Sequence, residues 1–511
     1  MPLDPVTLDA GRLTIAEVER VARRGALVRL GPTAYARVRA SRERVEAVLP
    51  SGRVLYGINT GFGSLSLARI PRKALRDLQH NLVRSHAAAV GVPLPDWLVR
   101  ATMLVLAASL CRGHSGIRLE VVERIVLLLN EHVTPVVPSI GSVGASGDLA
   151  PLAHVALVLI GEGQATRDGQ PLDVTQAHAA LGVTPLQLEA KEGLALVNGT
   201  HLMAAEAALL CADVERLFDA ALVANAMSHD AAKATDAFLD PRVYDVRAQP
   251  GPATVAAALR YCLVGSTVVE SHRTNDPRVQ DPYSFRCAPL VLGAVLDAFR
   301  YVRDRVKDEL AAVTDNPLVF PDDAIIAAGS FHGMTVALPL DVLGVLLTHV
   351  AGISQQRVFA LLAARDPESG LVPHLSPKPG LCSGLMLAQY TAAACCNELI
   401  GLATPATVAN LQTSAGIEDY NSFGPHAGRK ARRALELARF VVAIELLCAA
   451  QGLDLHSPLH SGDVVERARQ AVRTVVPPLT TDRPLGPDIE ALARLVDEDA
   501  FALGDASPVR G

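Results

Sequence analysis

Apolar residues in the second half of the chain recur with the spacing of long helices. From His201 onward, this pattern predicts helices over about 201–235, 252–270, 288–313, 335–364, 384–403 and 426–453. Several are apolar around most of their circumference: Val336 to Val350 contains one acid, Asp341, and one histidine, His349. Helices of that kind are buried on every side. The pattern therefore predicts a central bundle of long helices that packs against other subunits.

The first part of the chain predicts shorter helices. An amphipathic helix is expected over Ile15 to Arg24 and a second, rich in Arg and Glu, over Pro32 to Leu49. Two more are expected over 97–111 and 118–132, and a polar segment follows at about 163–183. We therefore expect a mainly α protein with two domains, an N-terminal one at residues 1–200 and a long-helix bundle at 201–511.

Composition favours packed helices and a small-molecule enzyme. Half of the residues are hydrophobic but only 4% are aromatic, so the core must be built from Ala, Leu and Val. The net charge of −6, from 47 basic and 53 acidic residues, argues against nucleic acid as a partner. Charges interrupt every apolar window of the first thirty residues, and the longest uncharged run, 399–417, contains Pro405. We expect a cytoplasmic enzyme with no membrane span.

The eight cysteines show no metal-site or redox spacing. They are scattered along the chain without a CxxC pair. This distribution is typical of buried thiols in a cytoplasmic protein. We therefore expect neither a disulfide framework nor a metal site.

The segment from Gly141 to Pro151 has the composition of a reactive turn. If the chain doubles back tightly, the amide nitrogen of Gly147 can attack the carbonyl carbon of Ala145 and close a five-membered ring. Loss of water, including the Ser146 hydroxyl, leaves an exocyclic alkene that is electrophilic. The alternative is a polar loop that caps a helix starting near Asp148. The eleven residues alone do not exclude that alternative.

Other glycine-rich and polar blocks interrupt the apolar pattern. They are Y-G-I-N-T-G-F-G at 56–63, L-V-R-S-H-A-A-A-V-G at 82–91, G-S-V-G-A-S-G-D-L-A-P-L at 141–152, K-E-G-L-A-L-V-N-G-T at 191–200, V-Q-D-P-Y-S-F-R-C at 279–287, T-D-N-P-L at 314–318, G-S-F-H-G at 329–333 and T-S-A-G-I-E-D-Y at 413–420. Together they resemble the histidine and aromatic amino acid ammonia-lyase family over nearly the whole chain. The resemblance implies a fumarase/aspartase-like helix bundle, with the reactive loop on the N-terminal domain.

The resemblance implies a catalytic group made from the chain itself. In this family Ala145, Ser146 and Gly147 would form a methylidene-imidazolone (MIO), so that no external cofactor is needed. Tyr56, on a mobile loop, would remove the proton β to the substrate carboxylate, and Asn198 would lie beside the ring. The resemblance also implies a homotetramer in which each active site draws on three chains.

The remaining family positions imply how the substrate is held. Arg286 would grip the substrate carboxylate in a bidentate manner, as a guanidinium does best. Gln280 and Tyr283 would complete the hydrogen bonds around ring and substrate, and Phe331 would pack beside the electrophile. His86 and Glu418 would face the substrate side chain.

The block at 279–287 and the acid at Glu418 indicate the histidine branch of the family. The resemblance thus implies conversion of L-histidine to trans-urocanate and ammonia. Ser330, Ile417 and Tyr420 depart from the family pattern and keep a tyrosine or phenylalanine ammonia-lyase, or an aminomutase, as the alternative. A catalytically silent scaffold is a further alternative. The residues do not decide whether the electrophile captures the substrate amine or attacks its ring.

Overall fold

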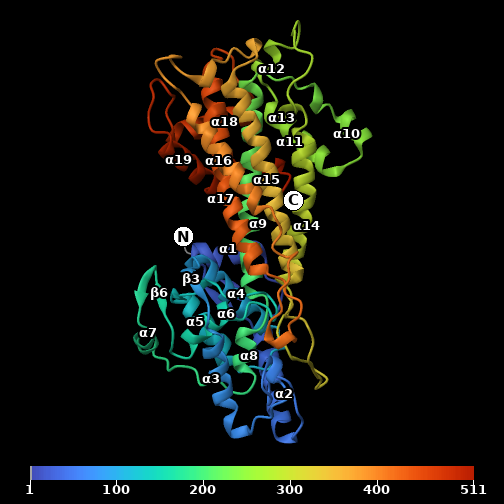
Figure 1. The fold of residues 1–511 in the computed structure, drawn as a ribbon, viewed down its shortest axis with the longest axis vertical. Coiled ribbons are helices and arrows are strands. Elements are labelled where there is room, and N and C mark those ends of the chain that lie inside the picture. The colour runs from blue at the N-terminus through green and yellow to red at the C-terminus, as the bar shows by residue number, and fades with distance from the viewer. Residues whose placement is uncertain (1–2, 511) are drawn as a thin grey trace. The chain divides into compact units, whose positions relative to one another are not determined.

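The computed structural model describes residues 3–510 and divides into two compact units. The first unit comprises Met1–Ala212, Arg303–Asp341 and Pro405–Arg429, and the second comprises Asp213–Val302, Val342–Thr404 and Lys430–Gly511. Both units consist mainly of helices (Figure 1), which confirms the predicted fold class. The predicted domain boundary at residue 200 stays a prediction.

Helices packed around α4 (Asp96–Cys111) form one half of the first unit. This helix packs on α1 (Ile15–Arg24) and on α5 (Leu119–Asn130), and every residue from Leu98 to Cys111 is buried. At the start of α1, Thr14 and Glu17 each accept a hydrogen bond from the other's backbone N–H. This reciprocal cap satisfies two N–H groups that no helix carbonyl can reach. The other helices of this region are α2 (Pro32–Val48) and α7 (Val174–Ala180).

Three helices of the first unit carry the segments that become important below. α3 (Leu75–His86), α6 (Ala150–Leu159) and α8 (Glu192–Val197) pack against one another. α3 ends at His86, α6 begins just after the 141–149 segment, and α8 ends next to Asn198. Their mutual packing therefore brings three distant stretches of sequence together.

Short strands join the helices of the first unit. β1 (Val6–Leu8) pairs in parallel with β2 (Val28–Leu30), with Val6 opposite Val28. The antiparallel pairs are β3 (Val90–Pro93) with β5 (Pro138–Ile140), β4 (Val133–Pro135) with β6 (Ala165–Arg167), β6 with β7 (Gln170–Leu172), and β8 (Leu318–Val319) with β9 (Ile325–Ile326). β5 leads directly into the 141–151 segment.

The second unit is built from helices. α11 (Pro250–Leu263) packs on α10 (Pro241–Arg247) and on α18 (Asp463–Val475), and α18 packs on α19 (Gly486–Asp497). The remaining helices of this unit are α12 (Thr267–Ser271), α13 (Tyr283–Arg286) and α16 (Met386–Leu402).

Four long helices contribute residues to both units: α9 (His201–Ala231), α14 (Ala288–Glu309), α15 (Met334–Ala363) and α17 (Gly424–Asp454). These four and α16 confirm five of the six predicted long helices. The sixth, predicted over 252–270, is wrong because the chain breaks between α11 and α12. Gly265 has a φ of +83°, a left-handed value that ends the first helix, and the Ser266 side chain caps the second.

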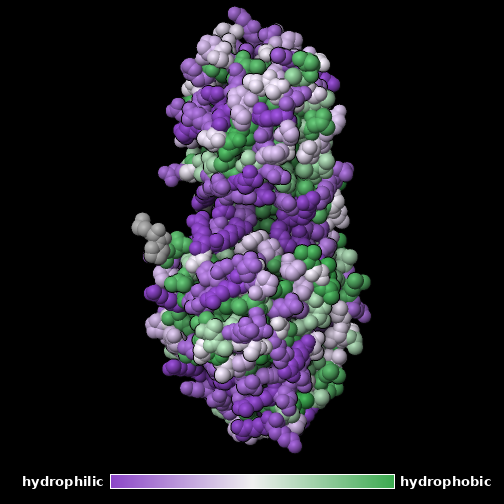
Figure 2. All heavy atoms as spheres, turned by 90° about the vertical axis from the view of Figure 1, so that its left-hand side faces the viewer, coloured by the Kyte–Doolittle hydropathy of each residue, from purple (hydrophilic) through white to green (hydrophobic). Residues whose placement is uncertain are grey.

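α15 is long and apolar enough to cross a membrane by length and composition, among the residues that the structure describes. Within its apolar window, 61% is buried in the protein, and core helices of soluble proteins pass the same test. Figure 2 shows one face of the molecule, on which hydrophilic side chains predominate and hydrophobic ones form smaller groups. The expectation of no membrane span stays a prediction.

Candidate active site

The segment between β5 and α6 forms a tight, largely buried loop. Ala145 and Gly147 are buried, whereas Ser146 is half-buried. Gly147 has a φ of +75°, and a Cβ at this position would lie 2.1 Å from the carbonyl oxygen of Gly199. Only glycine fits such a position, because both the backbone conformation and the space exclude a side chain. The backbone is therefore tightly packed at the glycine whose nitrogen would close the predicted ring.

Asn198 holds this loop from the end of α8. Its buried side-chain amide donates to the carbonyl oxygen of Ser146 at 2.9 Å, and the backbone N–H of Gly199 donates to the same oxygen at 3.4 Å. In the opposite direction, the N–H of Asp148 donates to the carbonyl of Gly199 at 2.8 Å. The amide of Asn198 thus already points at the oxygen that would become the carbonyl of the ring.

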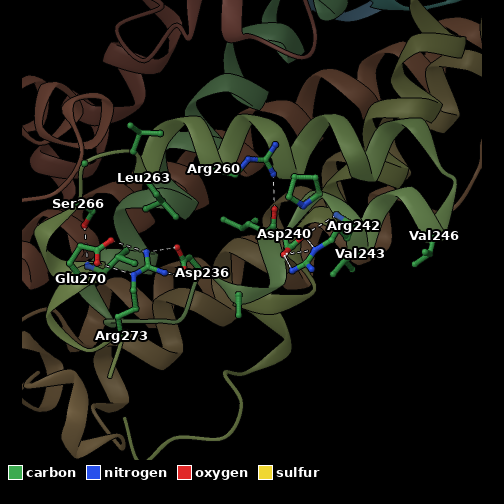
Figure 3. Close-up of a pocket in the computed structure, with 16 residues that line it drawn as sticks. Asp236, Asp240, Arg242, Val243, Val246, Arg260, Leu263, Ser266, Glu270 and Arg273 are labelled. Atoms are coloured by element: carbon green, nitrogen blue, oxygen red, sulfur yellow. Dashed lines mark hydrogen bonds and ion pairs between the residues drawn. The ribbon is translucent and has the colours of Figure 1, made fainter. Parts of the chain in front are cut away.

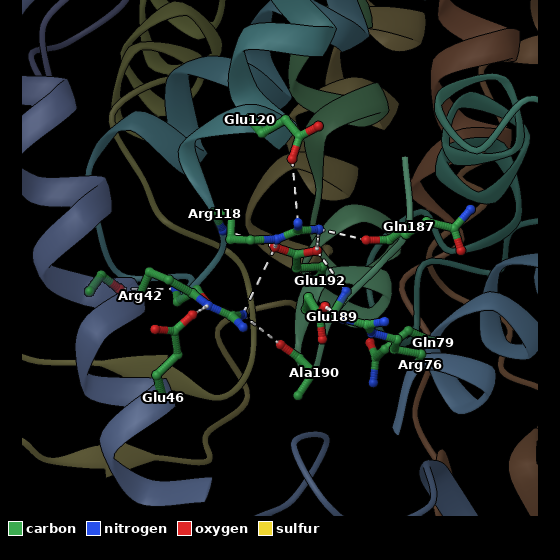
Figure 4. Close-up of polar contacts among 12 residues, drawn as sticks. Arg42, Glu46, Arg76, Gln79, Arg118, Glu120, Gln187, Glu189, Ala190 and Glu192 are labelled. Atoms are coloured by element: carbon green, nitrogen blue, oxygen red, sulfur yellow. Dashed lines mark hydrogen bonds and ion pairs between the residues drawn. The ribbon is translucent and has the colours of Figure 1, made fainter. Parts of the chain in front are cut away.

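A buried carboxylate fixes the other end of α8. Arg118 donates to both oxygens of Glu192, at 2.8 and 2.7 Å, and a guanidinium nitrogen of Arg42 lies 3.9 Å away (Figure 4). The Glu192 side chain is fully buried, and a buried carboxylate is stable only when it is paired and hydrogen-bonded. This arrangement holds α8 in place and, through it, Asn198.

Glu418 lies against Ser146. The Ser146 hydroxyl donates to Oε1 of Glu418 at 3.1 Å, and the Thr413 hydroxyl donates to Oε2 at 2.7 Å. Glu418 is half-buried, and no ion pair to it is found among residues 3–510. Its carboxylate is therefore held by hydroxyl groups and not neutralised by a cation.

Tyr56 lies on a loop that is anchored to the core and touches the Glu418 segment. Ile58 is fully buried in a hydrophobic cluster, and the Tyr56 hydroxyl accepts a hydrogen bond from the N–H of Gly63 at 3.3 Å. The N–H of Ser64 donates to the side chain of Ser414 at 3.4 Å. The loop at 56–64 and the segment at 413–418 are thus neighbours.

His86 ends α3 and lies within electrostatic reach of Glu418. Its ring nitrogen Nδ1 is 3.1 Å from the Ser85 hydroxyl. Burial lowers the pKa of His86 below its usual value, and the Leu82 carbonyl and the Glu418 carboxylate partly offset this shift. At neutral pH the imidazole of His86 is therefore uncharged.

The 329–333 segment also reaches the loop. The N–H of Gly333 donates to the carbonyl of Gly144 in the loop at 3.4 Å. Phe331, which is half-buried, lies two residues before Gly333 in the chain. The ring of His332 stacks on Tyr420 with centroids 6.4 Å apart, and its Nε2 is 3.0 Å from the Tyr420 carbonyl oxygen. Tyr420, which departs from the family pattern, is thus held beside the Glu418 segment.

Gln280, Tyr283 and Arg286 come together in the second unit. Arg286 donates to the side-chain oxygen of Gln280 at 2.9 Å and lies over the ring of Tyr283, 4.6 Å from its centroid. A further nitrogen of Arg286 donates to the backbone carbonyl of Asp281 at 3.0 Å. No carboxylate pairs with Arg286 within the described part of the chain, so the guanidinium retains donors for an anion.

Two residues at this site were not predicted. Burial raises the pKa of Asp148 well above its usual value, although the N–H of Leu202 donates to its carboxyl group at 2.6 Å. Thr413 is the other residue. Asp148 directly follows Gly147, and Thr413 begins the block that contains Glu418. Because both lie inside blocks already recognised in the sequence, their places in those blocks could have identified them as site residues.

A large cavity in the second unit lacks reactive chemistry. It has a volume of about 890 Å³ and lies between α10, α11 and α12. Figure 3 shows Arg273 pointing toward Asp236 and Glu270 and, farther along, Arg242 toward Asp240. These charged groups pair with one another, and none of the predicted site residues lines the cavity. Within residues 3–510, no cluster of three or more potential metal ligands is found either.

The chain is similar to known ammonia-lyases and to an aminomutase. The family model described as aromatic amino acid lyase matches residues 13–474. Histidine ammonia-lyase of Myxococcus xanthus is 47% identical over 96% of both chains. The structure of histidine ammonia-lyase from Trypanosoma cruzi superimposes with a TM-score of 0.90 at 36% identity, covering 99% of this chain and 97% of that one. Tyrosine aminomutase from Streptomyces globisporus gives a TM-score of 0.92 at 33% identity, with 97% of both chains covered.

The fold and the comparisons together define a carbon–nitrogen lyase. The chain belongs to the aromatic amino acid lyase family.

Proposed function

We propose that the protein is a histidine ammonia-lyase, which converts L-histidine to trans-urocanate and ammonia. The observation that carries this proposal is the carboxylate of Glu418, 3.1 Å from the hydroxyl of Ser146. An acid at this distance from the reactive loop suits an imidazole, whose ring N–H donates a hydrogen bond. The relatives from Myxococcus xanthus and Trypanosoma cruzi, both histidine ammonia-lyases, support the same conclusion.

The proposal includes an MIO group formed from Ala145, Ser146 and Gly147. The residues present fit this group, because position 147 has no room for a Cβ and the amide of Asn198 donates to the Ser146 carbonyl oxygen. When formed, the group supplies an electrophilic alkene. We propose that no external cofactor is needed.

The other residues would act on the substrate directly. Tyr56 would take the proton β to the carboxylate, since its phenol lies on the loop next to the Glu418 segment. Arg286, assisted by Gln280 and Tyr283, would bind the carboxylate. Phe331 would pack against the reacting group.

Glu418 and His86 would select the imidazole. Phenylalanine would leave both polar groups without a partner, at a cost of about 1–3 kcal/mol for each desolvated group. The neutral ring of His86 can donate or accept a hydrogen bond without competing for the charge of Glu418.

We further propose that the enzyme is a cytoplasmic homotetramer with shared active sites. In support, α16 buries only Ala388, Ala392 and Leu399, while large apolar side chains remain exposed in the single chain, namely Leu387 at 51%, Tyr390 at 58% and Ile400 at 65%. Exposed apolar surface on this scale is typical of subunit interfaces. The cysteines of the described chain are free thiols, as in the reducing cytoplasm.

The test is a substrate panel of L-histidine, L-tyrosine and L-phenylalanine. Near-ultraviolet absorbance would follow the conjugated acrylate, and an ammonia assay would run in parallel. The proposal expects both signals with L-histidine alone. Product from an aromatic substrate only would contradict it, and a β-amino acid without ammonia release would identify an aminomutase, which the 33% identical tyrosine aminomutase keeps as the alternative.

A further inference from the structure

The segment that carries Glu418 is a tight hairpin closed by Thr413. The N–H of Thr413 donates to the carbonyl of Glu418 at 3.0 Å, and the N–H of Glu418 donates back at 3.3 Å. Between them, Ser414, Ala415 and Gly416 have φ values of 51°, 54° and 88°. The first two are left-handed conformations that side chains disfavour, so the closing bonds must hold the turn.

The side chains of the two closing residues also meet. The Thr413 hydroxyl donates to Oε2 of Glu418 at 2.7 Å, while Oε1 accepts from Ser146 at 3.1 Å. Each carboxylate oxygen therefore has its own hydroxyl donor. Maturation of the loop would remove the Ser146 hydroxyl as water, whereas the Thr413 hydroxyl would remain.

This difference distinguishes the two oxygens of Glu418. After loss of the Ser146 hydroxyl, Oε2 keeps a donor from its own hairpin and Oε1 does not. A substrate N–H would then find the free acceptor at Oε1, the oxygen that faces the reactive residue. Without the threonine hydroxyl, the carboxylate could rotate about its last bond, and its oxygens would no longer be held in one direction.

We propose that Thr413 is a positioning residue, which fixes the rotation of the Glu418 carboxylate so that Oε1 faces the substrate imidazole. The inference rests on the proposed function, because it concerns the same site. Thr413 does not touch the substrate. Its effect is transmitted through one hydrogen bond to Glu418.

The experiment compares Thr413→Val, which removes the hydroxyl at nearly constant volume, with Thr413→Ser, which retains it. We expect Thr413→Val to raise KM for L-histidine about tenfold with kcat within about threefold, since a charge-assisted hydrogen bond is lost. Thr413→Ser should restore KM to within about threefold of the original. The intact mass must show the same loss of two waters in both variants, which establishes that the catalytic loop has matured.

A matched control removes a similar bond elsewhere in the first unit. Thr166 in β6 donates to the carboxylate of Asp96 at 3.0 Å, and its hydrogen bonds reach none of the residues of the proposed site. Thr166→Val should leave KM for L-histidine unchanged. A rise in KM equal to that of Thr413→Val would show a general effect of threonine replacement and would overturn the inference.

Inhibition by two acrylates separates positioning from a structural role. In Thr413→Val, inhibition by trans-urocanate should weaken about tenfold, whereas inhibition by trans-cinnamate, which has no ring N–H, should stay within about twofold. Equal weakening of both, or failure of Thr413→Ser to restore KM, would overturn the inference. If the unsubstituted protein did not act on L-histidine, the proposed function itself would fail, which is a different result.

Discussion

Two glutamates, one in each unit, show how the same side chain is prepared for different tasks. Glu445 in the second unit is fully buried; Arg357 donates to both of its oxygens and the Ser228 hydroxyl donates at 2.8 Å. Glu418 in the first unit is half-buried and accepts only from hydroxyl groups. A buried cation neutralises Glu445, an arrangement typical of a structural carboxylate. Glu418 has no such counter-charge among the described residues.

The same contrast applies to the arginines. Arg357 is fully buried and donates hydrogen bonds to Glu445 and to the backbone carbonyl of Ser284. Arg286 binds a neutral amide oxygen and a backbone carbonyl, and it has no acid partner among residues 3–510. Within the part of the chain that the structure describes, Arg286 and Glu418 therefore share the lack of a counter-charge, whereas Arg357 and Glu445 neutralise each other.

The largest effect on activity should come from Ser146→Ala. Without the hydroxyl, dehydration cannot occur, and we expect kcat for L-histidine to fall by about 10⁴-fold or more. The free energy of unfolding should change by less than about 0.5 kcal/mol, because Ser146 is half-buried and adds no core packing. Steady-state kinetics and urea unfolding measure the two effects. A variant with substantial activity would remove the reactive loop from the account.

Glu445→Gln should affect stability and not the chemistry. It leaves Arg357 charged and buried without its partner, and we expect a loss of about 3–5 kcal/mol in the free energy of unfolding. Activity per folded molecule should be retained, as judged by kcat below the unfolding transition. A stability loss under about 1 kcal/mol would mean that Glu445 is not the structural member of the pair.

Glu418→Gln should show the reverse. A neutral amide replaces a charged acceptor, and we expect kcat/KM for L-histidine to fall about 10–100-fold with less than about 1 kcal/mol change in stability. Inhibition by trans-cinnamate, whose ring has no N–H, should suffer no comparable loss. Kinetics with L-histidine and inhibition by trans-cinnamate provide the check, and an equal loss in both would contradict a role in recognising the imidazole.

His86 should give the smallest effect, visible in the pH dependence. Its pKa is lowered, so the ring is neutral at pH 7 and takes up a proton only as the pH falls below its usual value of about 6.5. The cation would then attract Glu418 and compete with the substrate.

This competition should appear when the fall of kcat/KM at acid pH is compared between the unsubstituted protein and His86→Gln. Below about pH 6, kcat/KM for L-histidine should fall roughly threefold more in the unsubstituted protein than in His86→Gln. Titration of the substrate imidazole affects both proteins equally, because the substrate is the same, so it cancels in the comparison. Parallel acid limbs would show that His86 and Glu418 do not interact.

The sequence predicted the parts of this account that depend on periodicity and on motifs. Five long helices follow from apolar spacing, and α11 and α12 were predicted as one helix because the break between them, Val264 to Ser266, is only three residues long. The reactive loop and Asn198 were recognised from their motifs. The structure adds the hydrogen bond between Asn198 and the Ser146 carbonyl oxygen.

Other features depend on contacts that no local pattern contains. The hydroxyl pair around Glu418 joins residues 146 and 418, which are 272 positions apart. Thr413 was not among the predicted site residues, and only the structure shows that its hydroxyl donates to Glu418. The distinction between Glu418 and Glu445 is likewise absent from the sequence, because their partners Ser146 and Arg357 lie 272 and 88 positions away, respectively.

The most direct test of the central claim is the mass of the peptide that contains Ala145, Ser146 and Gly147, measured on the purified chain. The account predicts a mass lower by two water molecules than the encoded sequence, and the same peptide from Ser146→Ala should keep its encoded mass. A peptide at full mass from a preparation that nevertheless deaminates L-histidine would contradict the claim that this loop provides the electrophile.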